Sequence, residues 1–179
     1  AKDVIQDDSK ENRERQRAAA EIKSLLSSIR PFEESGVLVR VCKRLTELLQ
    51  QGMQQGSSSK DSIQQLIIEH GVVPIVEMLQ VTDPMLLRQV LKVVNQIVAE
   101  WNHDFQELFS MVGLIPGVIK FAGSEFARDL RVEAGTFISR LCNSGSSSLQ
   151  MLIACGGLEA IVDLISYDYY QNRDLVWNA

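Results

Sequence analysis

The chain has 179 residues, 45% of them hydrophobic, and a formal net charge of −5. This length and apolar content suit a folded domain with a sizeable core and exclude a disordered tail. The acidic balance argues against nucleic acid as the main partner, because phosphate binding needs a basic face.

The sequence predicts a cytoplasmic protein with no membrane insertion. It lacks the basic-then-apolar layout of a signal peptide, and no apolar run reaches membrane-spanning length. The cysteines, Cys42, Cys142 and Cys155, are widely spaced in apolar helical sequence. We therefore expect free thiols rather than a disulfide framework.

The first helix is predicted over residues 9–29, with Ser9 as its N-cap. It should end at Arg30, because a residue before proline is pushed out of the helical conformation. A second helix is predicted over residues 34–51. The Gln/Gly/Ser stretch 52–59 has no apolar anchor, so it is predicted to be a mobile loop.

From residue 61 onward the predicted helices recur in sets of a short, a medium and a long helix. The sets are 61–70, 72–80 and 83–101; 103–112, 114–122 and 125–142; and 147–155 with 157–166, followed by the start of a further long helix. The long helices should bury an apolar stripe that includes Leu91, Val94, Phe137, Ile138 and Leu141.

The segment that joins each short helix to its medium helix is repeated, beginning at Gly71, Gly113 and Gly156. These glycines lie 42 and 43 residues apart, a period typical of HEAT and armadillo solenoids. We predict an all-α, armadillo- or HEAT-like, right-handed superhelical solenoid whose repeated glycines end helices at positive φ. The expected units are 1–30, a helical extension or partial repeat; 31–60, the long helix of a first repeat plus the mobile loop; 61–101 and 102–143, two full repeats; and 144–179, a truncated repeat.

One long helix resembles the armadillo consensus E-A-A-W-A-L-S-N-I-A. Its sequence over residues 133–142 is EAGTFISRLC. Peptide-binding armadillo proteins of the importin-α type carry Trp and Asn on this helix, four residues apart, and the Asn side chains clamp an extended peptide. Thr136 and Arg140 stand at those positions here, and Lys92 and Gln96 stand there in the preceding unit. The resemblance implies the fold without the nuclear-import or catenin type of binding.

A narrower resemblance rests on the runs NHDFQE at 102–107, VGLIP at 112–116, FAG at 121–123 and YDY at 167–169. These runs resemble the septation-initiation and mitotic-exit kinases of fungi and the plant MAP kinase kinase kinase epsilon. Such kinases carry an armadillo-like region after the kinase domain. The resemblance spans roughly residues 20–177 and implies a place at the spindle pole, centrosome or division site.

No catalytic, cofactor or metal site is predicted. The chain has no glycine-rich phosphate loop and no H-R-D or D-F-G motif, and its histidines, His70 and His103, stand apart from the cysteines. The candidate binding surface is an exposed, mildly basic stripe on the long helices, together with an aromatic cluster near the C-terminus. The candidate protein-binding residues are Arg88, Lys92, Gln96, Arg131, Arg140, Tyr167 and Tyr169.

The favoured interpretation is a non-catalytic interaction module, the regulatory or localisation region of a septation- or cytokinesis-type serine/threonine kinase. Its partner would be a scaffold protein, a small GTPase, an acidic or phosphorylated peptide, or a second copy of the chain. The alternative is a stand-alone armadillo adaptor or transport-type scaffold with no kinase attached. Two simpler interpretations also remain open: the polar stripe is only a solvated helix face, and the tyrosines only pack between layers of the solenoid.

Overall fold

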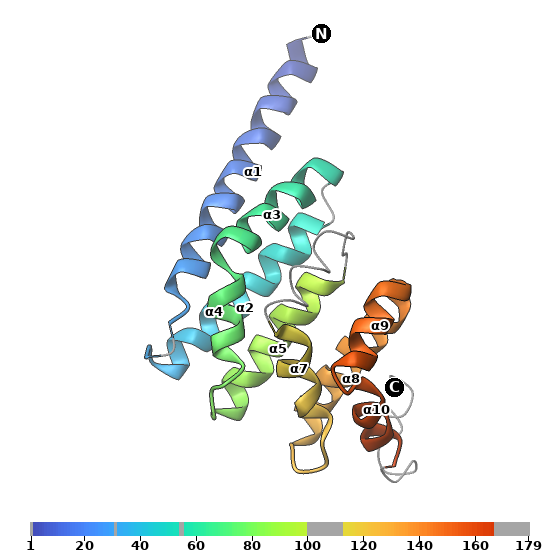
Figure 1. The fold of residues 1–179 in the computed structure, drawn as a ribbon. Helices are drawn as coiled ribbons and strands as arrows, with labels where there is room; N and C mark the ends of the chain where they lie inside the picture. Colours follow the sequence, from blue (N-terminus) through green and yellow to red (C-terminus); the bar gives the residue numbers. More distant parts are fainter. Residues whose placement is uncertain (1, 31, 54–55, 100–112, 167–179) are drawn as a thin grey trace.

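The computed structural model describes residues 2–30, 32–53, 56–99 and 113–166, and within these ranges every regular element is a helix (Figure 1). The elements are α1 (Lys2–Ser28), α2 (Ser35–Met53), α3 (Gly56–His70), α4 (Val72–Met78), α5 (Pro84–Val98), α7 (Leu114–Ile119), the 3-10 helix η1 (Lys120–Ala122), α8 (Arg128–Ser144), α9 (Ser146–Ala154) and α10 (Gly157–Ile165).

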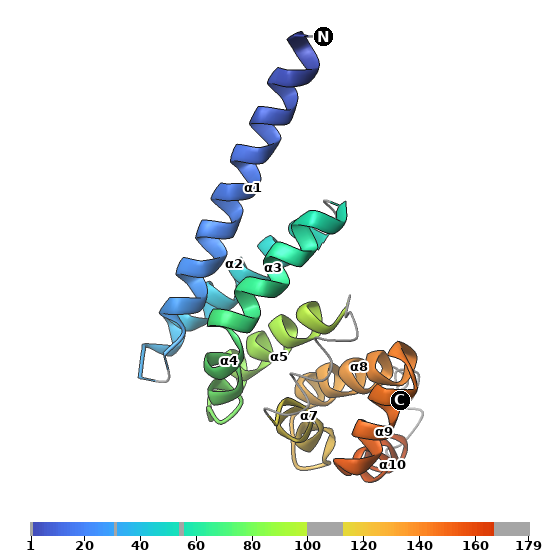
Figure 2. The ribbon, with the colours of Figure 1, turned by 45° about the horizontal axis from the view of Figure 1, so that its top comes forward.

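The helices stack in chain order as an open solenoid. The long helices form one layer, in which α2 packs against α5 and α5 packs against α8. Shorter helices cover this layer: α3 contacts α2, α4 contacts α5, and α7, α9 and α10 contact α8. Figures 1 and 2 show α1 at one end of the stack and α9 with α10 at the other. The prediction of an all-α solenoid is confirmed.

The long helices are held together by the apolar stripe that their sequence pattern predicts. Leu91, Val94, Phe137, Ile138 and Leu141 are each no more than 1% exposed. Burying one such side chain contributes about 1.5–3 kcal/mol relative to leaving it in water. The helical phase predicted for α5 and α8 is therefore confirmed.

The first helix is longer than its sequence predicts. It begins at Lys2, so Ser9 lies inside the helix rather than at its cap. Residues 10–20 are rich in Lys, Glu, Arg, Gln and Ala, which favour helix without any buried face. The helix ends at Ser28, as the Arg30-Pro31 pair predicts. Two hydrogen bonds from Arg44 of α2 to the Glu21 carboxylate, 2.7 and 3.1 Å long, tie α1 to its neighbour.

The interpretation of residues 52–59 as one loop is wrong. Helix α2 continues through Met53 and α3 already begins at Gly56, while residues 54–55 lie outside the described part of the chain. Gly52 is buried, and a Cβ on it would collide with the Ile63 side chain of α3. The missing side chain lets the two helices approach here, a packing role that composition alone does not reveal.

The repeated glycines behave differently from one another. Gly113 and Gly156 have φ of 80° and 90°, as predicted for a helix terminus, whereas Gly71 has φ of −107°. Gly71 is instead required by space, because a Cβ there would lie 3.1 Å from both the Ile67 carbonyl oxygen and a Leu26 methyl group. The same sequence signal thus reflects positive φ in two units and close packing in the first.

Candidate protein-interaction surface

The outer side of α5 carries the predicted polar stripe. Arg88, Lys92 and Gln96 are spaced by four residues, so they lie on one side of the helix. All three are half-buried, while nearly every other residue from Leu86 to Val98 is buried. Asp83 starts this helix as predicted, because its side chain accepts hydrogen bonds from the Met85 and Leu86 N–H groups.

Helix α8 continues this surface beside α5. Thr136 and Arg140 are half-buried and Asn143 is exposed. The Thr136 hydroxyl donates to the Val132 carbonyl within its own helix, at 2.9 Å. We call the six side chains on the outer side of α5 and α8 the long-helix face: Arg88, Lys92, Gln96, Thr136, Arg140 and Asn143.

Arg140 is anchored within the protein rather than extended from it. Its guanidinium donates to the Asn95 carbonyl oxygen of α5. Burial lowers the pKa of Arg140 from its ordinary value, and the nearby Glu133 carboxylate opposes this shift. The Asn95 amide in turn donates to the backbone carbonyl and to the carboxylate of Glu133, both at 2.9 Å. Asn95, Glu133 and Arg140 therefore form a polar bridge between α5 and α8.

Sequence reasoning missed Asn95. It lies in the run Val93-Val94-Asn95, and it is only 5% exposed. A buried polar side chain needs a hydrogen-bonding partner, so an Asn that directly follows two valines was a usable signal for a contact between repeats.

The long-helix face is less basic than its sequence predicts. The Arg88 guanidinium forms an ion pair of 2.9 Å with the Asp129 carboxylate of α8, and Glu133 lies beside Arg140. Among the described residues, Lys92 has no carboxylate within 4.0 Å. The face thus combines partly neutralised arginines with the half-buried residue Lys92.

The expectation that Arg131 belongs to this exposed stripe is wrong. Arg131 is 1% exposed, and it donates to the carbonyl oxygens of Ala122 at 3.0 Å and Asp163 at 2.9 Å. It precedes Arg140 by nine residues, which at 3.6 residues per turn places it about 180° around the helix. Arg131 therefore points toward η1 and α10 and joins them to α8.

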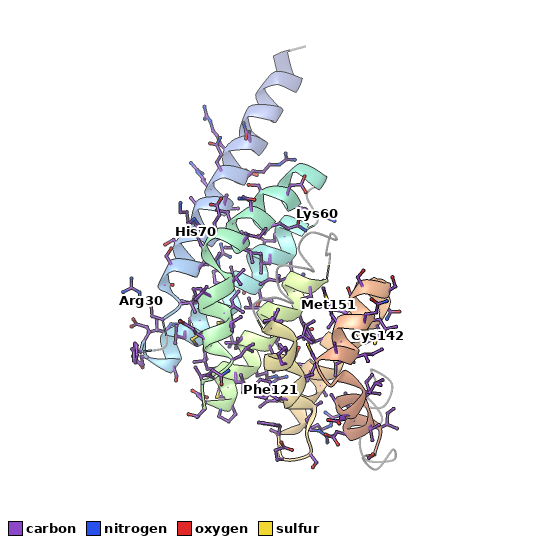
Figure 3. The ribbon with its side chains drawn as sticks, viewed as in Figure 1. Arg30, Lys60, His70, Phe121, Cys142 and Met151 are labelled. Carbon is purple, nitrogen blue, oxygen red and sulfur yellow. The ribbon has the colours of Figure 1, made fainter. Side chains whose placement is uncertain are left out.

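A second basic side chain that the sequence did not single out makes a similar contact. The Lys120 ammonium group donates to the Leu79 carbonyl at 3.1 Å and to the Gln80 side chain at 3.4 Å, and it lies 4.8 Å from the centre of the Phe121 ring. Phe121 is labelled in Figure 3 near the end of α7. Lys120 binds a carbonyl group at the end of α4, in the preceding unit, whereas Arg131 binds one at the end of η1 and one near the end of α10. Positive charge is favourable at the C-terminal end of a helix.

Several predicted features cannot be placed. Tyr167, Tyr169 and the run at 102–107 lie outside the described residues. Within the described part of the chain, no three His, Cys, Asp or Glu side chains are grouped so that they could hold a metal ion. No single helix in this part of the chain is long and apolar enough to cross a membrane. Helices α9 and α10, which are bent by 84° at their junction, reach that length and apolar composition only when they are taken together.

No protein-family model matches the chain. The relatives include a named protein kinase and a named cytokinesis protein. Over 160 residues, 88% of the chain, it is 35% identical to MAP3K epsilon protein kinase 1 of Arabidopsis thaliana. Over 161 residues, 89% of the chain, it is 27% identical to the cytokinesis protein sepH of Aspergillus niger. The matched segment spans only 11% and 12% of these relatives' own lengths, so the chain is similar to one part of much longer proteins.

Comparison with solved structures identifies the fold. A designed armadillo repeat protein matches with a TM-score of 0.63 at 17% identity, over 87% of this chain and 61% of the other. The fold is that of an armadillo repeat solenoid. A second designed armadillo protein, solved in complex with the peptide (KR)4, matches with a TM-score of 0.56 at 17% identity, over 91% of this chain and 73% of the other. The resemblance to the septation-type and MAP3K epsilon kinases holds over most of the chain.

Proposed function

We propose that this chain is a non-catalytic protein-interaction module that binds a partner segment along its long-helix face. The observation that carries the proposal is the half-buried polar row of α5 and α8, which stands on a rigid layer of stacked helices. Solenoid proteins bind their partners along extended surfaces of stacked helices. A related fold bound to a peptide supports the same type of use.

The chemistry of the face favours an acidic or phosphorylated segment. Lys92 and Gln96 offer donors at helical spacing, and Lys92 has no carboxylate partner among the described residues. On the adjacent helix, the Arg140 guanidinium is already fixed in position by the Asn95 carbonyl. Fixed donors lose little conformational freedom on binding.

The biological setting that we propose is a septation- or cytokinesis-type serine/threonine kinase, in which this module would bind a scaffold protein or small GTPase and so locate the enzyme. The relatives support this setting, because one is named a protein kinase and the other a cytokinesis protein, and the segment of similarity is a minor part of each. Sequencing the full-length transcript tests it. A kinase domain in the same polypeptide is expected, and a transcript without one would instead support a stand-alone adaptor.

Lys92→Glu tests the binding surface. With the chain as bait, partners captured from cell lysate are identified by mass spectrometry, and the affinity of the recovered partner is then measured with purified proteins. Reversing this charge should weaken binding by about tenfold, or about 1.4 kcal/mol. The matched control is Lys23→Glu, the same change at an exposed site on α1. Equal affinity of both variants for the partner would place the binding surface elsewhere.

A further inference from the structure

A cavity of about 210 Å³ lies where α1, α2 and α3 meet, at the end of the stack opposite α9 and α10 (Figures 1 and 2). Its floor is apolar, because Ile22 of α1, Leu48 of α2 and Ile63 of α3 line it and are each no more than 4% exposed. Exposed residues of the same three helices form its rim, so the cavity opens to solvent. We call this space the α1 cavity.

Small residues at the helix contact create this space. Along the inner side of α1, Ile22 and Leu26 are fully buried. One turn before Ile22, the same side of the helix carries Ala18 and Ala19, which both line the cavity. Gly52 lines it from α2 and has no side chain to fill it. The space that large apolar side chains occupy further along α1 is therefore left open here.

Another contact between stacked helices shows closer packing. Where the end of α1 meets α2, α4 and α5, the remaining cavity measures only about 10 Å³. It is lined by Ile29, Cys42, Ile75, Met78, Val90 and Val93. A cavity needs roughly 10–15 Å³ to hold a single water molecule, so this contact is nearly closed. The α1 cavity is open by comparison and has room for a ligand group.

The rim of the α1 cavity indicates the charge of that ligand. Asn12, Gln16, Gln51 and Ser62 supply neutral amide and hydroxyl groups, and all four are exposed. Arg15 is half-buried, and it is the one charged residue among the described residues that line the cavity. A guanidinium binds a carboxylate through two parallel hydrogen bonds. One guanidinium balances the single charge of a carboxylate, whereas a phosphate group carries nearly two.

We propose that the α1 cavity binds a ligand that carries an apolar group beside a carboxylate. The apolar group packs on Ile22, Leu48 and Ile63, and the carboxylate pairs with Arg15. A free organic acid and the carboxyl terminus of a peptide that ends in an apolar residue share this chemistry. The cavity has no residue in common with the long-helix face, so the proposal is independent of partner binding there.

Solution NMR of the isotope-labelled chain tests the proposal with N-acetyl-leucine, octanoate and N-acetyl-leucinamide as probes. At least one of the two acids should shift the backbone amide signals of Ala19 and Ile63 in a saturable way. N-acetyl-leucinamide should bind at least about tenfold more weakly than N-acetyl-leucine, because it cannot pair with Arg15. Tighter binding of N-acetyl-leucine than of octanoate would indicate a peptide carboxyl terminus, and the reverse order would indicate a free acid.

Two pairs of variants separate the floor of the cavity from its charge. Ala19→Leu fills the space and should abolish binding, whereas Ala20→Leu, at the adjacent exposed position, should leave it unchanged. Arg15→Gln should weaken binding of the acids by at least about tenfold, and Arg13→Gln, at an exposed site on the same helix, should not. Circular dichroism checks that all four variants keep their helix content.

Three results would overturn the proposal. They are the absence of saturable shifts with either acid, equal affinity for N-acetyl-leucine and its amide, and acid binding that Arg15→Gln leaves unchanged. If Ala19→Leu loses helix content, the comparison of Arg15→Gln with Arg13→Gln still decides, because neither changes the volume of the floor.

Discussion

At the scale of single residues, Arg131 is the most informative side chain. Its guanidinium is buried and satisfies the carbonyl groups of Ala122 and Asp163, so it joins α8 to both neighbouring helical segments. Arg131→Gln should lower the free energy of unfolding by about 3 kcal/mol, because carbonyl groups would be left buried without a donor. Urea denaturation followed by circular dichroism measures this change.

The control for this substitution is Arg30→Gln. Arg30 is exposed at the connection between α1 and α2 (Figure 3), and the same change there should alter the stability by less than about 0.5 kcal/mol. If Arg131→Gln were equally mild, water rather than the guanidinium would be satisfying these carbonyl groups.

The contrast between Arg131 and Arg140 shows what the sequence could reveal at this scale. Both arginines lie on one helix, and their nine-residue separation already places them on opposite sides of it. The phase of the helix was therefore available from the sequence, and grouping them as one stripe overlooked it. The carbonyl partners of Arg131, which lie in two other elements, could not be inferred without the tertiary structure.

At the scale of elements, the core of α8 gives a direct test of packing. Phe137 of α8 is fully buried. Phe137→Ala should cost about 3–5 kcal/mol, from lost burial together with the cavity that remains. The neighbouring Thr136 is half-buried on the long-helix face, and Thr136→Ala should cost far less. Thermal denaturation of both variants compares them, and similar losses would contradict the observed phase of α8.

The sequence predicted those elements that carry their own signals. Apolar residues at helical spacing identified α5 and α8, and Asp83 with Pro84 marked the start of α5. It failed for residues 52–59, where glycines and serines indicated a loop although helices occupy both ends of the stretch. The reason is the close approach of Gly52 on α2 to Ile63 on α3. Composition alone cannot reveal a contact between residues of two different helices.

At the scale of the whole molecule, each unit of a solenoid is stabilised only by its neighbours, so units at the ends open more easily than those within. The reactivity of the cysteines can reveal which units open first. Cys42 of α2 is 2% exposed, and burial raises its pKa to about 12. Cys155 lies half-buried between α9 and α10, at the end of the stack opposite α1.

We therefore expect the cysteines to react with a thiol reagent in a fixed order. With a pKa of about 12, only about one Cys42 thiol in ten thousand is ionised at pH 8, so Cys42 should react only when α2 opens. Cys155 should react first, and low concentrations of urea should speed its labelling before that of Cys42. Mass spectrometry of digested, labelled protein measures the order, and simultaneous labelling would mean that the solenoid opens as a single cooperative unit.

The raised pKa of Cys42 also predicts how the stability of the protein depends on pH. The folded state holds the Cys42 proton more tightly than the unfolded chain does, because the buried thiolate would lose its hydration. This contribution is fully present below the ordinary cysteine pKa of about 9 and is lost as the pH rises toward 12. Cys42→Ala should therefore flatten the fall in unfolding free energy over this range, at the cost of a small cavity. An unchanged slope in urea titrations at several alkaline pH values would show that other groups control it.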